Sequence, residues 1–296
     1  MGLVLTSVQN LLELRDLGFF KNSNSVCEMG SQELMLKKND LKSLFECAGI
    51  KTDLVDQYPD IDNWPNHPRC SSKNLFKTLG LNEYQSIDIN SEHGAIGHDL
   101  NNPFEDVSMF NKFDLVTDFG TCSHIFNIPE CYKTMHKLVK TGGLIIVQQQ
   151  IMKGSGYFFL DTPILHAMAA ANNYKIISTN YIVRTGTKTA EGSDHYYFIP
   201  MALPLLDVIN YGKITGIDVH AVFQKQNDND YKFPYTGSIM KDNFSSKGFG
   251  RMYMQDPLSS HYIPSSKLNI EEVSFKKIIT EFFRRSKNRI KNIFFR

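Results

Sequence analysis

The sequence predicts an α/β fold built on a doubly wound, mostly parallel sheet of seven strands with an antiparallel edge hairpin. Apolar segments typical of strands alternate with segments of helical periodicity, which indicates crossover units and parallel pairing. The last two expected strands have no helix between them, and such a pair usually forms an antiparallel hairpin. With 296 residues, 42% of them hydrophobic, the chain can bury a sizeable core.

The N-terminal half is expected to begin with a helix over about 6–17, because leucines and a valine recur there at helical spacing. Next come a strand at 25–28, a helix at about 32–46, a loop or insertion at about 47–70, a short helix at 72–79, and strands at 84–89, 95–100 and 113–120. The insertion is assigned because its prolines and asparagines break both periodicities. Ser71 is expected to cap the short helix.

The strongest helical pattern of the chain follows the last of these strands. Asn127 stands at the N-cap position, with Glu130 three residues later and apolar residues along one face. Gly142 and Gly143 are expected to end this helix. The remaining elements are a buried strand at 144–149, a helix at 162–172, and strands at 175–182 and 218–224.

The chain is expected to divide into a main domain at 1–226, an irregular extension at 227–270 and a basic amphipathic helix at 271–296. This terminal segment carries eight Lys and Arg against three Glu, with apolar residues on one side. Such a helix lies on an anionic membrane, docks a protein partner, or packs on its own domain. All three alternatives stay open.

The bulk composition bounds the class of protein. A formal net charge of +1 argues against a nucleic-acid binder, which would be clearly basic. Five scattered cysteines without a C-x-x-C pair are typical of reduced thiols, so a cytoplasmic protein is expected. The protein would be peripheral to a membrane only if its basic C-terminal helix binds one. No metal site is expected, because the nearby Cys and His residues at 122–136 lack the spacing of zinc ligands.

Four of the expected strands end in acids: Glu28, Asp88, Asp99 and Asp118. In an open α/β sheet, ligands bind outside the carboxyl ends of the strands. Carboxylates there repel a phosphate but accept hydrogen bonds from a ligand with hydroxyls, amino groups and a positive charge. The alternative is that these acids are turn and capping residues.

The order of these motifs resembles a known family. The stretches "CEMG", "SIDIN", "GHDLNNPF", "FDLVTDFGTCSHIFN" and "LVKTGGLIIV" together resemble class I S-adenosylmethionine-dependent methyltransferases with a Rossmann-like fold, over about 25–226. The chain is most similar to bacterial methyltransferases that accompany sugar or surface-glycan genes. The implied activity is O-methylation of a sugar or glycan-linked small acceptor.

The resemblance implies S-adenosylmethionine as cofactor and assigns roles to the strand ends. Glu28, Gly30 and Ser31 would hold its methionine part, and Asp88 its ribose hydroxyls. By the same resemblance, Asp99 would accept from the adenine amino group, Ile89 and Leu100 would lie at the ring, and Asp118, Phe119 and Gly120 would line the floor beneath the sulfonium. One departure stands in the first motif, because the family pattern acid-x-Gly-x-Gly has Gln32 here at its second glycine.

A hydroxyl acceptor needs a base whose pKa lies near the working pH, which favours histidine. His124, just beyond the fourth strand, is the first candidate for this base, and His98, Asp118 and His195 are weaker ones. The alternative for His124 is a helix-entry role or a hydrogen bond to the cofactor. Tyr157 and Phe158 are expected to stack on the substrate or to pack under the next helix. His195 is a further substrate candidate, within a stretch that forms either a lid or an ordinary loop.

Two other classes of function remain. A catalytically inactive methyltransferase-like module would act as a binding protein through its basic C-terminal helix. A nicotinamide-dependent oxidoreductase would bind its cofactor at the same turn, the one after Glu28, but the absence of G-x-G-x-x-G after the first strand counts against it.

Overall fold

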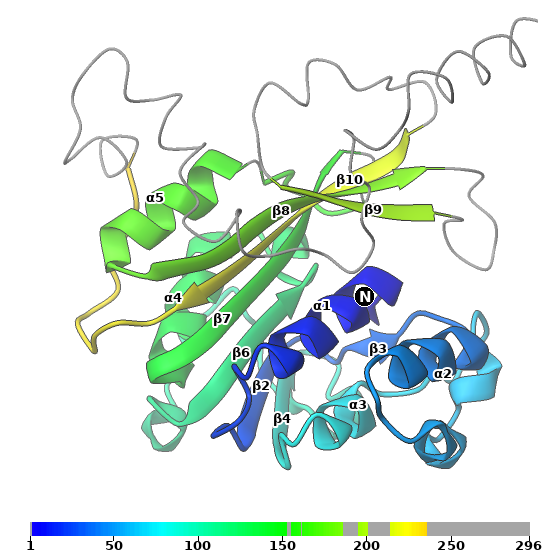
Figure 1. The fold of residues 1–296 in the computed structure, drawn as a ribbon. Coiled ribbons are helices and arrows are strands. Elements are labelled where there is room, and N and C mark those ends of the chain that lie inside the picture. The colour runs from blue at the N-terminus through cyan, green and yellow to red at the C-terminus, as the bar shows by residue number, and fades with distance from the viewer. Residues whose placement is uncertain (1, 153–154, 161, 186–194, 201–213, 236–296) are drawn as a thin grey trace, which may run out of the picture. The chain divides into compact units, whose positions relative to one another are not determined.

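The computed structural model describes all residues except 1, 153–154, 161, 186–194, 201–213 and 236–296 (Figure 1). The chain divides into two compact units, Met1–Tyr262 and Ile263–Arg296. The second unit lies outside the described residues, and so do the basic helix expected at 271–296 and most of the extension expected at 227–270. Within the part of the chain that is described, no helix is long and apolar enough to cross a membrane.

The main sheet has eight strands in the order β5-β4-β2-β6-β7-β10-β8-β9. Their bounds are β2 Ser25–Met29, β4 Glu83–Asp88, β5 Ile96–Gly97, β6 Phe113–Phe119, β7 Val139–Met152, β8 Lys175–Thr185, β9 His195–Pro200 and β10 Ile214–Gln224. The first five strands in this order pair in parallel, whereas β10 pairs antiparallel with both β7 and β8. The predicted α/β fold with its mostly parallel sheet and antiparallel pair is therefore confirmed. Strand β9, which was not predicted, adds an eighth strand at the edge.

Helices cover both faces of this sheet, as a doubly wound fold requires (Figure 1). The helices are α1 Leu5–Asp16, α2 Lys38–Cys47, α3 Lys73–Thr78, α4 Ile128–Leu138 and α5 Thr162–Asn172, with short 3-10 turns at Thr52–Gln57, Ile61–Asn63, Glu92–Gly94, Val107–Met109 and Cys122–His124. The first three helices share one apolar cluster with Leu115, and the last two share another with Val116. Because neighbouring residues of a strand point to opposite faces, the two clusters lie on opposite sides of the sheet.

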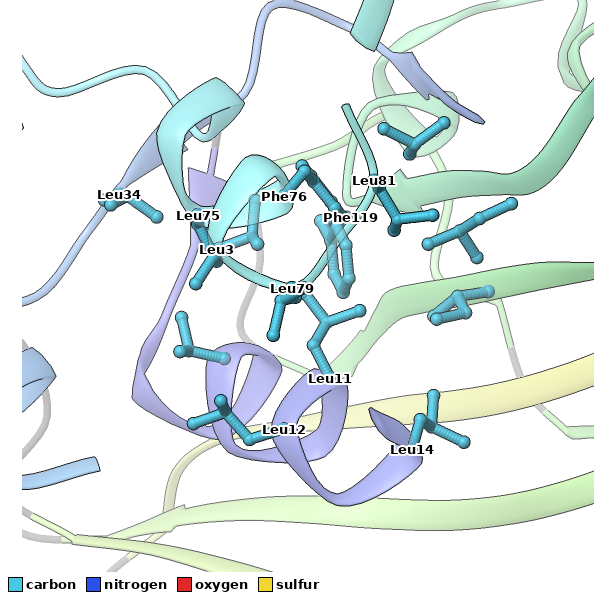
Figure 2. Packing of buried hydrophobic residues seen from close by; sticks show 14 of the residues in the cluster. Leu3, Leu11, Leu12, Leu14, Leu34, Leu75, Phe76, Leu79, Leu81 and Phe119 are labelled. Carbon is cyan, nitrogen blue, oxygen red and sulfur yellow. The ribbon is translucent and has the colours of Figure 1, made fainter. Parts of the chain in front are cut away.

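The cluster beneath α1 fixes the end of the central strand β6. Figure 2 shows Phe119, the last residue of β6, packed among leucines of α1 and the segment around α3, including Leu11 and Leu79. Leu11 is fully buried, and burying a side chain of this size contributes about 1.5–3 kcal/mol. This packing holds the loop after Phe119 at a defined place on the carboxyl edge of the sheet.

The helix expected at 32–46 begins only at Lys38. Glu33–Leu34 instead forms a short strand, β3, which pairs in parallel with β1 at Gly2–Leu3. The helical pattern was misleading here, because the backbone groups of this segment pair with a partner about thirty residues away in the sequence.

The fourth helix also ends earlier than predicted, at Leu138, and β7 begins at the next residue. The buried Lys225 ammonium donates to the carbonyl oxygens of His136 (2.9 Å) and Val139 (3.0 Å), which are left without helical partners there. Asn127 stands at the N-cap of α4 as predicted, but its side chain makes no capping hydrogen bond and donates instead to the Asn101 carbonyl at 2.9 Å.

Candidate functional site

The order of the sheet defines one crevice at its carboxyl edge. Strand β2 lies between β4 and β6, and the chain passes from β2 to β4 on one side before crossing to β6 on the other. This reversal of strand order is the place where open α/β sheets bind ligands. The carboxyl ends of β2, β4 and β6 and the loops that follow them carry most of the predicted site residues.

Asp88, at the end of β4, joins two of these loops. Its carboxylate accepts hydrogen bonds from the backbone amides of Ser31 (2.8 Å) and Asn90 (3.2 Å), one at each oxygen. The residue is half-buried, and each oxygen keeps a lone pair for a further donor. The neighbouring Ile89 is 72% exposed and offers an apolar surface beside the carboxylate.

Glu28, at the end of β2, is more deeply buried than Asp88. Its side chain is fully buried, and one oxygen, Oε2, accepts hydrogen bonds from the hydroxyls of Ser72 and Tyr84, the latter at 2.6 Å. Burial raises the pKa of this carboxyl to about 8, although both hydroxyls oppose the shift. The other oxygen, Oε1, is buried without a hydrogen-bond partner. When this carboxyl is ionised, Oε1 becomes a buried acceptor without a donor, which suits a ligand group that carries positive charge.

Gly30 follows Glu28 at the sharp turn out of β2. Its φ of +92° is a conformation that side chains disfavour, and an added Cβ would lie 2.3 Å from the Thr121 hydroxyl. The Gly30 amide donates to the Ile87 carbonyl at 2.8 Å. The glycine is therefore required for the close approach of the β2 loop to the β6 loop.

The structure gives Asp118 a role in holding a turn. One oxygen accepts from the amides of Thr121 (2.9 Å) and Cys122 (3.1 Å), and the other accepts from the side chain of Gln149. Burial raises the pKa of this carboxyl to about 6. Asp118 faces the α4 side of the sheet, whereas Phe119 packs on the α1 side and Gly120 turns with a φ of +91°.

Asp99 forms a turn of its own, one strand farther along the edge. It accepts from the backbone amide (3.0 Å) and the side chain (2.8 Å) of Asn101, which lower the pKa of its carboxyl. Leu100 is buried against α4, where its carbonyl receives the Cys131 thiol at 3.6 Å. Asp99 and Leu100 thus border the crevice without a hydrogen bond to the loops after β2 and β6.

His124 ends the 3-10 turn that follows β6 and is half-buried. Partial burial lowers the pKa of its imidazole, so the ring is neutral near pH 7 and can take up a proton. The adjacent Ser123 carbonyl accepts from the amides of Tyr157 (2.8 Å) and Phe158 (3.2 Å) in the loop after β7. Tyr157 is 74% exposed, and the rings of Phe126 and Phe158 are 6.2 Å apart.

His195 begins β9, opposite Thr185 on β8. Because β9 is the far edge of the sheet, three strands beyond β7, the structure does not group His195 with His124. Residues 195–200 form a strand, which corrects the prediction of a lid or loop for this part of the stretch. The part at 186–194 lies outside the described residues.

Sequence reasoning missed two polar groups of the site. The side chain of Gln32 donates to the Met29 carbonyl (2.8 Å) and to the Thr121 hydroxyl (2.6 Å). A second, buried chain of polar contacts beneath α1 runs from Ser7 through Gln148 and Asp218 to Arg184. Its sequence signal is a run of three glutamines, 148–150, at the end of an apolar strand, and Asp218 between apolar residues of another.

No protein-family model matches the chain, and no curated protein matches it. Among solved structures, it is similar to a SAM-dependent methyltransferase from Archaeoglobus fulgidus, with a TM-score of 0.40 and 11% identity over 75% of this chain and 94% of that one. It is also similar to Haemonchus contortus phosphoethanolamine N-methyltransferase 2 in complex with S-adenosyl-L-methionine, with a TM-score of 0.38 and 10% identity over 74% of this chain and 52% of that one. At these scores the assignment of the fold rests on the sheet order itself.

Proposed function

We propose that the protein is an S-adenosylmethionine-dependent methyltransferase that methylates a hydroxyl of a sugar or glycan-linked small acceptor. The observation that carries the proposal is the pair of acids at the switch point of the sheet. Asp88 is half-buried with free lone pairs, and Glu28 has a buried oxygen without a partner. Hydroxyls and an ammonium group are the donors that these two acids lack.

The residues present fit this cofactor, which would span the crevice from β4 to β2. Asp88 would accept from the ribose hydroxyls, and the exposed Ile89 would pack against the adenine ring. Glu28 would receive the ammonium of the methionine part. When bound, the cofactor would supply a methyl group already activated by a sulfonium.

The loops after β6 and β7 would serve the acceptor. His124 would take the proton of the attacking hydroxyl at an imidazole nitrogen, which its lowered pKa keeps free at neutral pH. Tyr157 and Phe158 stand beside it with exposed aromatic surface for the apolar face of a sugar ring. Holding the hydroxyl in line is the main task of the protein in such a reaction.

One observation favours a second candidate, a methyltransferase-like binding module without activity. The Glu28 end of the crevice is sealed, because Glu28 and Gln32 are both buried. Such a module would act through the basic segment at 271–296, on a protein partner or a membrane surface.

Two measurements test the proposal. Calorimetric titration with S-adenosylmethionine and S-adenosylhomocysteine should show micromolar binding that NADH does not compete with. Incubation with cofactor carrying a labelled methyl group and a panel of sugars and nucleotide sugars should then transfer the label. Binding without transfer to any acceptor favours the inactive module, and the absence of binding contradicts the proposed function.

A further inference from the structure

A second buried polar side chain, that of Gln32, lies near the Glu28 end of the crevice. Gln32 is 1% exposed and spans from the β2 loop to the β6 loop, donating to the Met29 carbonyl and the Thr121 hydroxyl. Its own oxygen, Oε1, is buried without a hydrogen-bond partner. The side chain therefore fills the space between the two loops at the cost of an unsatisfied acceptor.

The backbone around Gln32 is fixed, so only the side chain is free to leave. The Gln32 carbonyl accepts from the Ser72 amide at 3.1 Å, and the preceding Ser31 amide donates to Asp88 at 2.8 Å. Glutamine has three rotatable side-chain bonds and can swing out without moving these anchors. The same Ser72 donates its hydroxyl to Glu28, so one residue contacts both the Glu28 carboxylate and the Gln32 backbone.

We propose that Gln32 sets which ligands this crevice accepts, by closing the path to Glu28 until a ligand with an ammonium group displaces its amide from Thr121. A ligand that only occupies the Asp88 end, such as a nucleoside, binds without moving Gln32. Before a ligand can reach Glu28, it must break both hydrogen bonds of the Gln32 amide. Its apparent affinity is therefore its intrinsic affinity multiplied by the fraction of molecules in which the side chain is open. This inference rests on the proposed function and deepens it.

Calorimetric titration of three proteins with S-adenosylmethionine and with adenosine tests the inference. The proteins are the wild type, Gln32→Ala, and Thr121→Val, which removes only the hydroxyl that holds the amide. We expect Gln32→Ala to bind S-adenosylmethionine about tenfold more tightly and Thr121→Val several-fold more tightly, since the net strength of each lost hydrogen bond is modest. Adenosine should bind all three proteins equally. Thermal melting confirms that both variants are folded.

The outcomes separate the inference from the proposed function. If Gln32→Ala weakens the binding of S-adenosylmethionine, Gln32 is a direct ligand and the inference is overturned. Equal affinities for all three proteins overturn it too, while leaving the proposed function intact. If neither compound binds any of the proteins, the proposed function fails and the inference fails with it.

An NMR measurement gives a readout that does not depend on turnover. The side-chain amide protons of Gln32 should exchange slowly in the free protein, because they are buried and hydrogen-bonded. Adding S-adenosylmethionine should shift this resonance and speed its exchange, whereas adenosine should leave it unchanged. A Gln32 resonance that responds equally to both compounds would contradict the inference.

Discussion

The two ends of the crevice use the same kind of residue in opposite ways. Asp88 and Glu28 both stand at the end of a parallel strand, yet Asp88 is half-buried and hydrogen-bonded to backbone amides, whereas Glu28 is fully buried and hydrogen-bonded to side-chain hydroxyls. The difference comes from the neighbours. An exposed isoleucine follows Asp88, while hydroxyls from the N-cap residue of α3 and from β4 bind Glu28. An acid at a strand end thus does not by itself show whether its carboxylate is open to a ligand.

The largest expected effect lies outside both ends, at His124. Replacing His124 with Gln should lower turnover by about 10²- to 10⁴-fold, because the attacking hydroxyl loses its base. The affinity for S-adenosylmethionine should not change, since neither end of the crevice is touched. The rate of the wild type should rise with pH to a plateau, with an apparent pKa below the ordinary histidine value. Turnover is measured with the labelled methyl group.

His98→Gln is the matched control for this change. His98 lies in the loop after β5, where its ring contacts Phe104 and the Asn102 carbonyl, so its loss should alter turnover only slightly. A larger effect of His98→Gln than of His124→Gln would contradict the assignment of the base.

The Asp88 end of the crevice is tested by Asp88→Ala. We expect the affinity for adenosine and for S-adenosylmethionine to fall together by about 30- to 100-fold, because a charged acceptor of two ribose hydroxyls is lost. Asp106→Ala is the control, since Asp106 also accepts a backbone amide in a turn but lies away from the crevice. Calorimetry on both variants measures the effect. If Asp88→Ala binds as tightly as Asp106→Ala does, the carboxylate is a turn residue.

The same contrast shows what a sequence can predict. The alternation of strands and helices and the acids at the strand ends follow from local patterns, and they located the crevice. The strand at Glu33–Leu34 and the early end of α4 depend on partners distant in the sequence, the strand Gly2–Leu3 and Lys225. No local pattern contains such partners.

The site was predicted in the same uneven way. Gly30 and Asp88 are positioned by the strand ends on which they stand. The partner of Asp118 is Gln149, on a neighbouring strand, and the partner of Gln32 is Thr121, in another loop. These contacts decide which carboxylate is free, and they exist only once the sheet has formed.

A smaller effect is expected at the acceptor surface. Tyr157→Ala should raise the KM for the acceptor about three- to tenfold and leave kcat nearly unchanged, because a stacking surface is lost. Phe233→Ala is the control, as Phe233 is also exposed but lies against Tyr231, near the end of α4. Steady-state kinetics separate the two parameters. Equal KM values for the two variants would place the acceptor elsewhere.

The smallest effect concerns stability at the sealed end. The pKa of Glu28 is raised to about 8 in the folded protein, above its ordinary value of 4.5. Between these values the folded state holds a proton that the unfolded state has lost, so stability falls as the pH rises through this window. Glu28→Gln removes this loss. It should melt roughly 3–8 °C above the wild type at pH 8.5 and at the same temperature at pH 5.

A melting curve in which Glu28→Gln loses stability equally at both pH values would contradict the sealed state of Glu28. Ser72→Ala gives a second measure, because it removes one hydroxyl that favours the charged form of Glu28. This variant should lose more stability at pH 8.5 than at pH 5.

Hydrogen exchange followed by mass spectrometry, with and without S-adenosylmethionine, tests the central claim most directly. Binding in the crevice should protect three separate segments, the loops at about 28–32, 88–99 and 118–124. The residues at 52–64, within the expected insertion, and the residues near the end of α4 should not change. Protection confined to other segments, or no protection at saturating cofactor, would contradict the assignment of this crevice as the cofactor site.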